Sequence, residues 1–191
     1  MPRAARVKSR VERAALELFA ANGVDGVSIA EIAAAAGVSQ GALYRHHTSK
    51  EELAWSLFST AYLRTGAELD RIRASRAEFE PAVTAMVAHF CALFDSDPAL
   101  FRFMLITQHG FLPRIPSGSR TPVDAVSDLV SDAVAKNRLK PVDPASGAAV
   151  IMGVILQSAT FHIYGRLSGP LGARAPALAR AAIAAVAALA E

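Results

Sequence analysis

The chain of 191 residues lacks several features that mark large classes of proteins. It has a single cysteine, Cys91, which excludes an intramolecular disulfide and a metal site built from clustered cysteines. Of the five histidines, His46 and His47 are adjacent and the others are far apart in sequence, so the spacing typical of zinc ligands is missing. We expect no metal site, and we expect Cys91 to be a buried apolar thiol, with redox sensing as the alternative.

Motifs of catalysis are missing as well. The one stretch that resembles a nucleophile elbow, Gly118-Ser119, lies in a proline-, glycine- and serine-rich segment without the strand-turn-helix context that the elbow needs. No glycine-rich phosphate loop is present, although nucleotide-binding enzymes commonly carry one. The sequence therefore predicts a protein that is not an enzyme and has no cofactor.

No long apolar run of the kind that crosses a membrane is evident. The most apolar stretch, residues 147–156, is followed by Gln157 and His162, whereas a membrane-spanning helix needs about 20 apolar residues. The basic N-terminus is not followed by the apolar segment of a signal peptide. We expect a soluble protein of the cytoplasm.

The residues that are abundant indicate helices. Apolar residues make up 52% of the chain and aromatic residues only 7%, and many of the apolar residues are alanine, the strongest helix former. The length suffices for one sizeable core or two small ones. These features predict an all-α protein.

Residues 27–53 have the pattern of two short helices joined by a tight turn. Ser28 and Glu31 form a predicted capping box, and Gly37 can end the first helix in a left-handed conformation. Ser39 can then cap the second helix. Leu43 is predicted to point inward and the polar side of the second helix outward, which is the arrangement of a helix-turn-helix whose second helix enters the DNA major groove.

Positive charge gathers in the same part of the chain. Residues 1–50 contain seven Lys or Arg and four acids, which accounts for the whole formal net charge of +3. A basic surface at the helix-turn-helix is what contacts with DNA phosphates require. A solvated basic end of the chain is the alternative interpretation.

The segment from about Arg6 to Leu53 resembles the DNA-binding domain of the TetR family of bacterial transcriptional regulators. One residue departs from the family pattern, since His47 stands where the family usually has phenylalanine. The residues that carry the resemblance are Ala14, Leu18, Phe19, Gly23, Ser28, Ile32, Ala33, Ala36, Gly37, Val38, Ser39, Gly41, Leu43, Tyr44, His46, Lys50, Glu51 and Leu53.

This resemblance implies an all-α fold of about nine helices in two domains. A three-helix helix-turn-helix domain would occupy residues 1–50, and a helical ligand-binding and dimerisation bundle would occupy residues 51–191. The implied function is a dimeric repressor that an apolar small molecule releases from a pseudo-palindromic operator in double-stranded DNA. The alternatives are a transcriptional activator and a helical ligand-binding or protein-interaction module without sequence-specific DNA binding.

The expected DNA contacts divide into two kinds. Gln40, Ala42 and Arg45 are predicted to reach base edges, because Gln pairs with adenine, Arg with guanine and an apolar group with the thymine methyl. The backbone at Gly41 is the alternative to Ala42 for contact with that methyl, and His46 is expected either to touch phosphate or to support Tyr44. The residues predicted to contact phosphates are Ser28, Ser39, Tyr44 and Lys50.

Apolar periodicity and proline positions predict the remaining helices. The first runs from Ala5 to Ala21, and a long one from Ser49 to Ala74 has a weak point for bending at Gly66. Further helices start at Pro81, Pro98 and Pro122. The last two helices, from Asp143 to Leu167 and from Pro176 to Ala190, are expected to pack against their symmetry copies in a dimer, with an intrachain hairpin as the alternative.

The resemblance also implies a small-molecule pocket in the C-terminal part. Its expected lining is apolar with a few polar groups, and each aromatic residue in it has a place in the core as its alternative. The predicted residues are Phe90, Phe94, Phe101, Met104, Gln108, His109, Phe111, Met152, Gln157 and Phe161.

Overall fold

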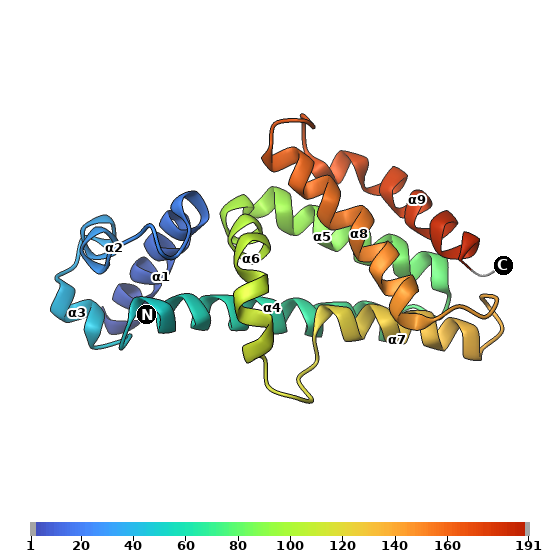
Figure 1. The fold of residues 1–191 in the computed structure, drawn as a ribbon, viewed down its shortest axis with the longest axis horizontal. Coiled ribbons are helices and arrows are strands. Elements are labelled where there is room, and N and C mark those ends of the chain that lie inside the picture. The colour runs from blue at the N-terminus through green and yellow to red at the C-terminus, as the bar shows by residue number, and fades with distance from the viewer. Residues whose placement is uncertain (1–2, 190–191) are drawn as a thin grey trace. The chain divides into compact units, whose positions relative to one another are not determined.

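The computed structural model describes residues 3–189, with side chains from residue 5 onward. These residues form nine α-helices, two short 3-10 helices and no strand (Figure 1), which confirms the all-α prediction. The helices are α1 (Arg3–Asn22), α2 (Ile29–Ala36), α3 (Gln40–Tyr44), α4 (Lys50–Ala74), α5 (Phe79–Ser96), α6 (Pro98–Phe111), η1 (Leu112–Arg114), α7 (Pro122–Ala135), α8 (Pro144–Ile163), η2 (Leu171–Arg174) and α9 (Ala175–Ala188).

The chain divides into two compact units. The first contains residues 1–61 and 99–117, and the second contains residues 62–98 and 118–191. Helix α4 contributes residues to both, and α6 packs with the N-terminal residues. The predicted division at residue 50 separates a DNA-binding from a ligand-binding domain by function. It stays a prediction.

The first unit is built on aromatic contacts. Phe19 of α1 stacks on Phe103 of α6, with ring centroids 5.9 Å apart, and both rings are fully buried. Phe111 contacts Trp55 and Phe58 of α4, at centroid distances of 5.8 and 5.4 Å. Because these rings join α1, α4 and α6, the helix-turn-helix shares its core with a helix from the middle of the chain.

In the second unit α5 packs against α7, α8 and α9. Helix α7 crosses α8 closely at Gly147, where a Cβ atom would lie 2.9 Å from a methyl group of Val130. Asp95 of α5 accepts hydrogen bonds from the N–H groups of Leu171 and Gly172, at 2.8 and 2.7 Å, and so fixes the start of η2. Burial raises the pKa of the Cys91 thiol to about 11, and the thiol is therefore an unreactive part of this core.

Gly66 has a role in packing that the sequence did not predict. A Cβ atom on it would lie 2.6 Å from the carbonyl oxygen of Arg120 and 2.8 Å from the carbonyl carbon of Thr121. Helix α4 continues through this position to Ala74. Gly66 therefore allows the backbone before α7 to approach α4, and the glycine is needed for packing.

Several helix ends differ from the predicted ones. Helix α8 stops at Ile163, short of the predicted Leu167, because Gly165 takes φ 68° and the Arg166 N–H bonds to the Phe161 carbonyl at 2.8 Å. Helix α5 begins at Phe79 and includes Pro81 in its first turn. The predicted end of the last helix, Ala190, lies outside the described residues.

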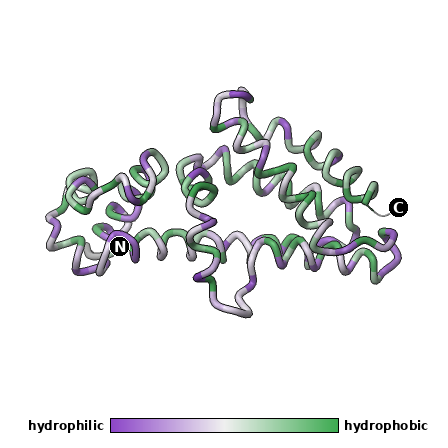
Figure 2. Tube along the Cα trace, viewed as in Figure 1, coloured by the Kyte–Doolittle hydropathy of each residue, from purple (hydrophilic) through white to green (hydrophobic). Residues whose placement is uncertain are grey.

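The expectation about apolar runs needs a correction. By length and composition two segments, Pro144–Ile163 and Leu171–Ala188, are apolar enough to cross a membrane. Both are green along much of their length in Figure 2. Both pack within the helical bundle of the second unit, and only 28% of each is buried in the single chain. A large apolar surface of this unit therefore faces outward.

Candidate nucleic-acid interface

Local hydrogen bonds define both helices of the helix-turn-helix. The Ser28 hydroxyl accepts the Glu31 N–H at 3.2 Å, and the Glu31 carboxylate accepts the Ser28 N–H at 2.7 Å. This is the predicted capping box, and the hydrogen bonds from Ser28 hold the pKa of the Glu31 carboxyl below its usual value. Ser39 caps α3 by accepting the Ala42 N–H at 3.2 Å. The start of each helix is therefore set by its own sequence.

The turn between the two helices depends on Gly37. Its φ of 62° is left-handed, and its N–H bonds to the carbonyls that end α2. The Arg10 guanidinium of α1 also donates to the carbonyls of Ala36 and Gly37, and a Cβ atom on Gly37 would meet that guanidinium at 2.8 Å. The glycine thus meets a conformational and a steric requirement at once.

Helix α3 presents a polar, exposed side and one buried anchor. Leu43 is fully buried, and Tyr44 is 52% exposed. The exposed predicted contact residues are Ser28, Ser39, Gln40, Gly41, Tyr44, Arg45 and His46, while Ala42 and Lys50 are half-buried. All nine lie on α3, at its ends or at the starts of α2 and α4 in the first unit, which we call the helix-turn-helix corner.

Lys50 has a partner inside the protein. Its ammonium donates to the carbonyl of Asp25 at 3.4 Å and lies 4.0 Å from the Glu51 carboxylate. Those contacts account for a cation in the first turn of α4, where the helix dipole disfavours it. A phosphate contact by Lys50 would add to this arrangement.

A shallow groove adjoins the exposed side of α3. It is lined by Arg6, Val7 and Arg10 of α1 together with Gly37, Val38, Ser39 and Ala42. Arg6 and Arg10 were not among the principal contacts predicted from the sequence. The i, i+4 spacing of the two arginines on the first helix is the signal that places them on one face.

His47, which stands where the family usually has phenylalanine, is a buried residue with a polar ring. It is only 7% exposed, and its Nε2 atom is buried without a hydrogen-bond partner among the described residues. Burial lowers the pKa of His47, Glu12 of α1 and Glu52 of α4 oppose this with smaller effects, and Lys8 of α1 adds to it. The imidazole is therefore neutral in the folded first unit near neutral pH.

The residues predicted to line a ligand pocket are divided between the two units. Phe90 and Phe94 of α5 are buried, and Phe161 of α8 is 45% exposed. Phe94 contacts the ring of His162 at 4.9 Å. In the second unit Met152 and Gln157 join these residues, and on α6 in the first unit lie Phe101, Met104, Gln108, His109 and Phe111. Their role in ligand binding stays a prediction.

Comparison with known proteins relates the helix-turn-helix corner to a family of bacterial regulators. Residues 13–56 match the sequence profile described as bacterial regulatory proteins, tetR family. The chain is 35% identical over 104 residues to a protein assigned as the mycofactocin biosynthesis transcriptional regulator MftR of Mycobacterium tuberculosis. That match covers 51% of this chain and 52% of MftR, so the chain matches about half the length of its curated relative.

Solved structures share the whole fold. The fatty acid degradation regulator FadR from Bacillus halodurans superposes with a TM-score of 0.82 at 17% identity, over 93% of this chain and 94% of that one. FadR from Bacillus subtilis, solved with stearoyl-CoA, gives 0.72 at 19% identity, over 92% and 97%. These likenesses show that the chain has the same fold as these proteins over more than nine-tenths of its length.

Proposed function

Because the chain belongs to the TetR family of bacterial regulatory proteins, we propose that it is a dimeric cytoplasmic repressor. In this proposal it binds a pseudo-palindromic operator, and an apolar small molecule releases it. The observation that carries the proposal is the helix-turn-helix corner, in which Ser28, Gly37 and Ser39 fix the backbone and the polar side of α3 stays exposed.

Base recognition would come from α3. Gln40 and Arg45 are both exposed, and their side chains suit adenine and guanine edges in the major groove. Each such contact contributes ~1–3 kcal/mol of discrimination between base pairs. Ser28, Ser39, Tyr44 and Lys50 would hold phosphates, which adds affinity for any sequence.

A competition assay on duplex DNA separates these roles. Arg45→Gln should reduce the preference for one base pair by roughly 5- to 150-fold, which corresponds to the loss of one specific contact. Tyr44→Ala should weaken binding to all duplexes alike, because a phosphate contact carries no sequence information. Equal effects of both variants on every duplex would contradict this assignment.

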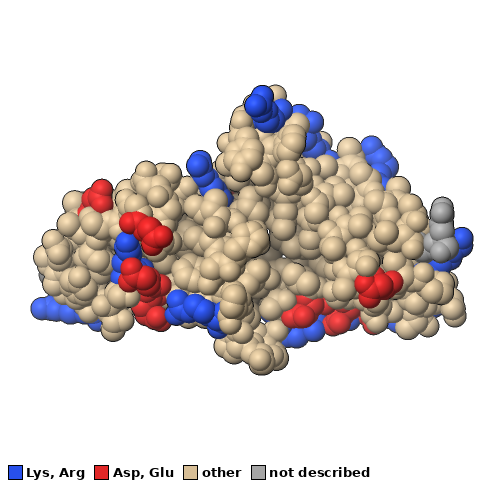
Figure 3. Space-filling model, in the orientation of Figure 1, with Lys and Arg blue, Asp and Glu red and all other residues tan. Residues whose placement is uncertain are grey.

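Dimerisation would use α8 and α9. Phe161, Tyr164 and Leu189 are 45, 71 and 44% exposed, and the surface that Figure 3 shows over α8 carries few charges. Apolar surface of this extent is typical of an interaction site. Since a pseudo-palindromic operator requires a two-fold axis in the protein, a second copy of the chain is the occupant that fits.

Sedimentation measures this interface directly. Phe161→Glu should shift the protein from dimer to monomer, because it places a charge in a desolvated apolar contact. Ile106→Glu is the matched control, since Ile106 is 47% exposed on α6, outside the proposed interface. A dimer that survives Phe161→Glu, or one that Ile106→Glu also breaks, would contradict the placement.

Release would act through α4, which contributes residues to both units. A ligand bound among the helices of the C-terminal part would tilt α4. The tilt would change the distance between the two helix-turn-helix corners of the dimer. A coupling of ~1–3 kcal/mol lowers operator affinity about 5- to 150-fold. The stearoyl-CoA held by the Bacillus subtilis relative supports an apolar ligand here. A tightly bound ligand that leaves operator affinity unchanged would contradict release.

A further inference from the structure

A small hollow in the second unit lies where α4 and α7 both end. We name it the Arg73 pocket, and the residues that define it are Arg73, Arg76, Phe79, Asp132, Lys136 and Arg138. The space open to the centre of a water-sized group is about 30 Å³. A single water needs roughly 10–15 Å³ by the same measure, so the hollow has room for one small ion and not for a drug-sized ligand.

The lining of the Arg73 pocket is strongly basic. Four of its residues are Lys or Arg and one is acidic. The acid, Asp132, is already engaged, since it accepts a hydrogen bond from the Arg73 guanidinium at 2.8 Å. Among the lining residues themselves cations therefore outnumber acids, and the carboxylates of Asp70, Asp128 and Glu78 lie beside Arg73 and Arg138.

Two of the four cations have no carboxylate partner. Arg76 donates only to the hydroxyl of Ser75, at 2.9 Å, and Lys136 has no ion-pair or hydrogen-bond partner for its ammonium among the described residues. Arg138, by contrast, donates to the Ala77 carbonyl and lies 3.3 Å from the Glu78 carboxylate. Arg76 and Lys136 are thus available to an anion.

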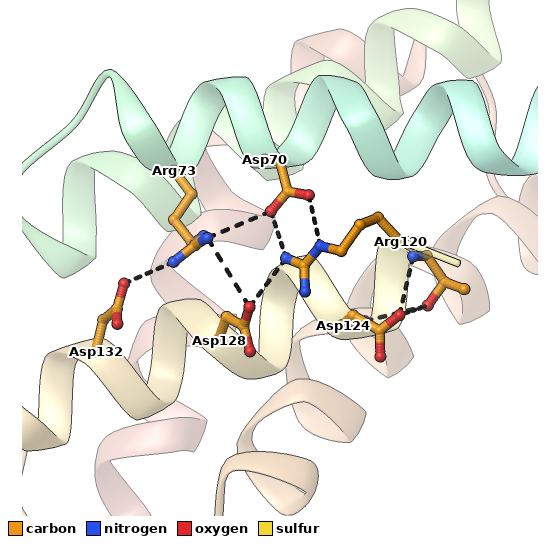
Figure 4. Close-up of polar contacts among 7 residues, drawn as sticks. Asp70, Arg73, Arg120, Asp124, Asp128 and Asp132 are labelled. Carbon is orange, nitrogen blue, oxygen red and sulfur yellow. Dashed lines mark hydrogen bonds and ion pairs between the residues drawn. The ribbon is translucent and has the colours of Figure 1, made fainter. Parts of the chain in front are cut away.

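Arg73 adds a buried donor without an acceptor. Figure 4 shows its guanidinium among carboxylates, with its terminal nitrogens 2.8 Å from Asp132, 3.5 Å from Asp70 and 3.9 Å from Asp128. Its remaining nitrogen, Nε, is buried and has no hydrogen-bond partner among the described residues. A buried donor on a charged group is normally satisfied, so Arg73 keeps one donor unused at this end of α4.

Helix-end capping does not account for these cations. Basic side chains often lie at helix C-termini because they compensate the terminal carbonyls. Here the carbonyls at the end of α7 already accept backbone N–H groups, at 3.1 Å for Asp132 and 2.8 Å for Ala133. At the end of α4 the Arg71 carbonyl accepts the Ser75 N–H at 3.0 Å.

We propose that the Arg73 pocket binds a small tetrahedral oxyanion, either inorganic phosphate or the phosphoryl group of a larger molecule. Its oxygens would pair with the exposed Arg76 and Lys136, beside the Arg73 guanidinium. Guanidinium groups suit this role because they present donors in a fixed plane to phosphate oxygens. The site does not depend on the proposed function, because neither its residues nor its test involves DNA.

Calorimetric titration of the full chain with inorganic phosphate tests the site, with chloride adjusted to keep ionic strength constant. The wild-type protein should show saturable binding at one site per chain. Arg76→Gln and Lys136→Gln should each raise the dissociation constant about tenfold, because each removes one charge-assisted contact. Both side chains are exposed, so these variants should fold. Arg73 is left unchanged because it also holds Asp70, Asp128 and Asp132 (Figure 4).

Lys140→Gln is the matched control. Lys140 is an exposed lysine shortly after α7 and does not line the pocket, so its removal should change the dissociation constant less than twofold. Absence of saturable phosphate binding to the wild-type protein would overturn the proposal. Equal weakening by Lys140→Gln, or weakening by Arg45→Gln on the DNA-binding corner, would overturn it too.

The same titration with adenosine monophosphate distinguishes the two sources of the anion. Tighter binding of the nucleotide than of phosphate, still weakened by Lys136→Gln, identifies a phosphoryl group on a larger molecule. Tighter binding of phosphate, weakened in the same way, identifies the free ion. Both results support the site.

Discussion

The helix-turn-helix corner and the contact between α4 and α7 are both held by polar side chains, but over different distances along the chain. Ser28 and Glu31, which cap α2, are three residues apart. Arg120 donates to Asp70 at 3.0 and 2.6 Å across a separation of 50 residues, and to Asp128 at 2.9 Å. Local polar contacts can be predicted from sequence, whereas contacts of this second kind require the fold.

The largest effect is expected from Gly66→Ala. The added Cβ would lie 2.6 Å from the Arg120 carbonyl oxygen, so the two segments must separate, at a cost of about 2–3 kcal/mol in the free energy of unfolding. Gly110→Ala is the matched control, because nothing lies within 4 Å of a Cβ there and alanine favours helix by ~0.5–1 kcal/mol. Urea denaturation measures both. Stabilisation by Gly66→Ala would show that α4 and α7 are not in close contact.

His47→Phe should stabilise the corner by about 1–2 kcal/mol, since it removes a buried, unsatisfied nitrogen. It should also reduce the pH dependence of stability. Burial lowers the pKa of His47 from its usual 6.5. Just below pH 6.5 the unfolded chain therefore binds a proton at His47 that the folded chain does not. The wild-type protein therefore loses stability as pH falls below 6.5.

Denaturation at pH 7.5 and pH 5.5 checks this second part. The variant should lose less stability than the wild-type protein between the two conditions. His89, whose pKa is also lowered by burial, contributes equally to both proteins. Identical losses would mean that His47 is accessible to protons in the folded head.

Loss of a cap should cost about 1 kcal/mol in either unit. The Thr121 hydroxyl accepts the Asp124 N–H at 3.2 Å, so the start of α7 repeats the capping box of Ser28 and Glu31. Ser28→Ala and Thr121→Ala should therefore destabilise the protein by similar amounts, measured by denaturation. A much larger effect for one of them would show that its cap also supports long-range packing.

The smallest effect is expected from Arg120→Gln, about 0.5–1 kcal/mol, because exposed ion pairs are weak. Its hydrogen bonds lower the pKa of Asp70, which contributes stability at neutral pH. That contribution is lost as pH falls through the lowered pKa, where Asp70 is protonated. The difference between the variant and the wild-type protein should therefore shrink in acid and in high salt. A difference independent of both would contradict the ionic account.

The same distinction explains how much of the fold could be predicted. The ends of α2 and the start of α3 follow from Ser28, Gly37 and Ser39, whose contacts are all local. The packing role of Gly66 could not be predicted, because the segment that approaches it, residues 120–122, is distant in sequence. The stop of α8 at Ile163 depends on the left-handed Gly165, and a glycine in an apolar helix does not by itself predict a stop.

The candidate site divides in the same way. The exposed side of α3 and the buried Leu43 follow from helical periodicity. The bond from Lys50 to the Asp25 carbonyl could not be predicted, because it joins the start of α4 to a loop. The Arg73 pocket combines residues from the ends of two helices, and no spacing in the sequence indicates it.

Selection of bound fragments from random duplex DNA, at moderate salt, tests the central claim most directly. The wild-type protein should enrich an inverted repeat, and Tyr44→Ala and Lys50→Ala should bind that repeat more weakly. The two half-sites should lie one helical turn or more apart, as a dimer with two heads requires. If the wild-type protein enriches no sequence, the chain does not read DNA by sequence, and its function lies in the helical C-terminal part.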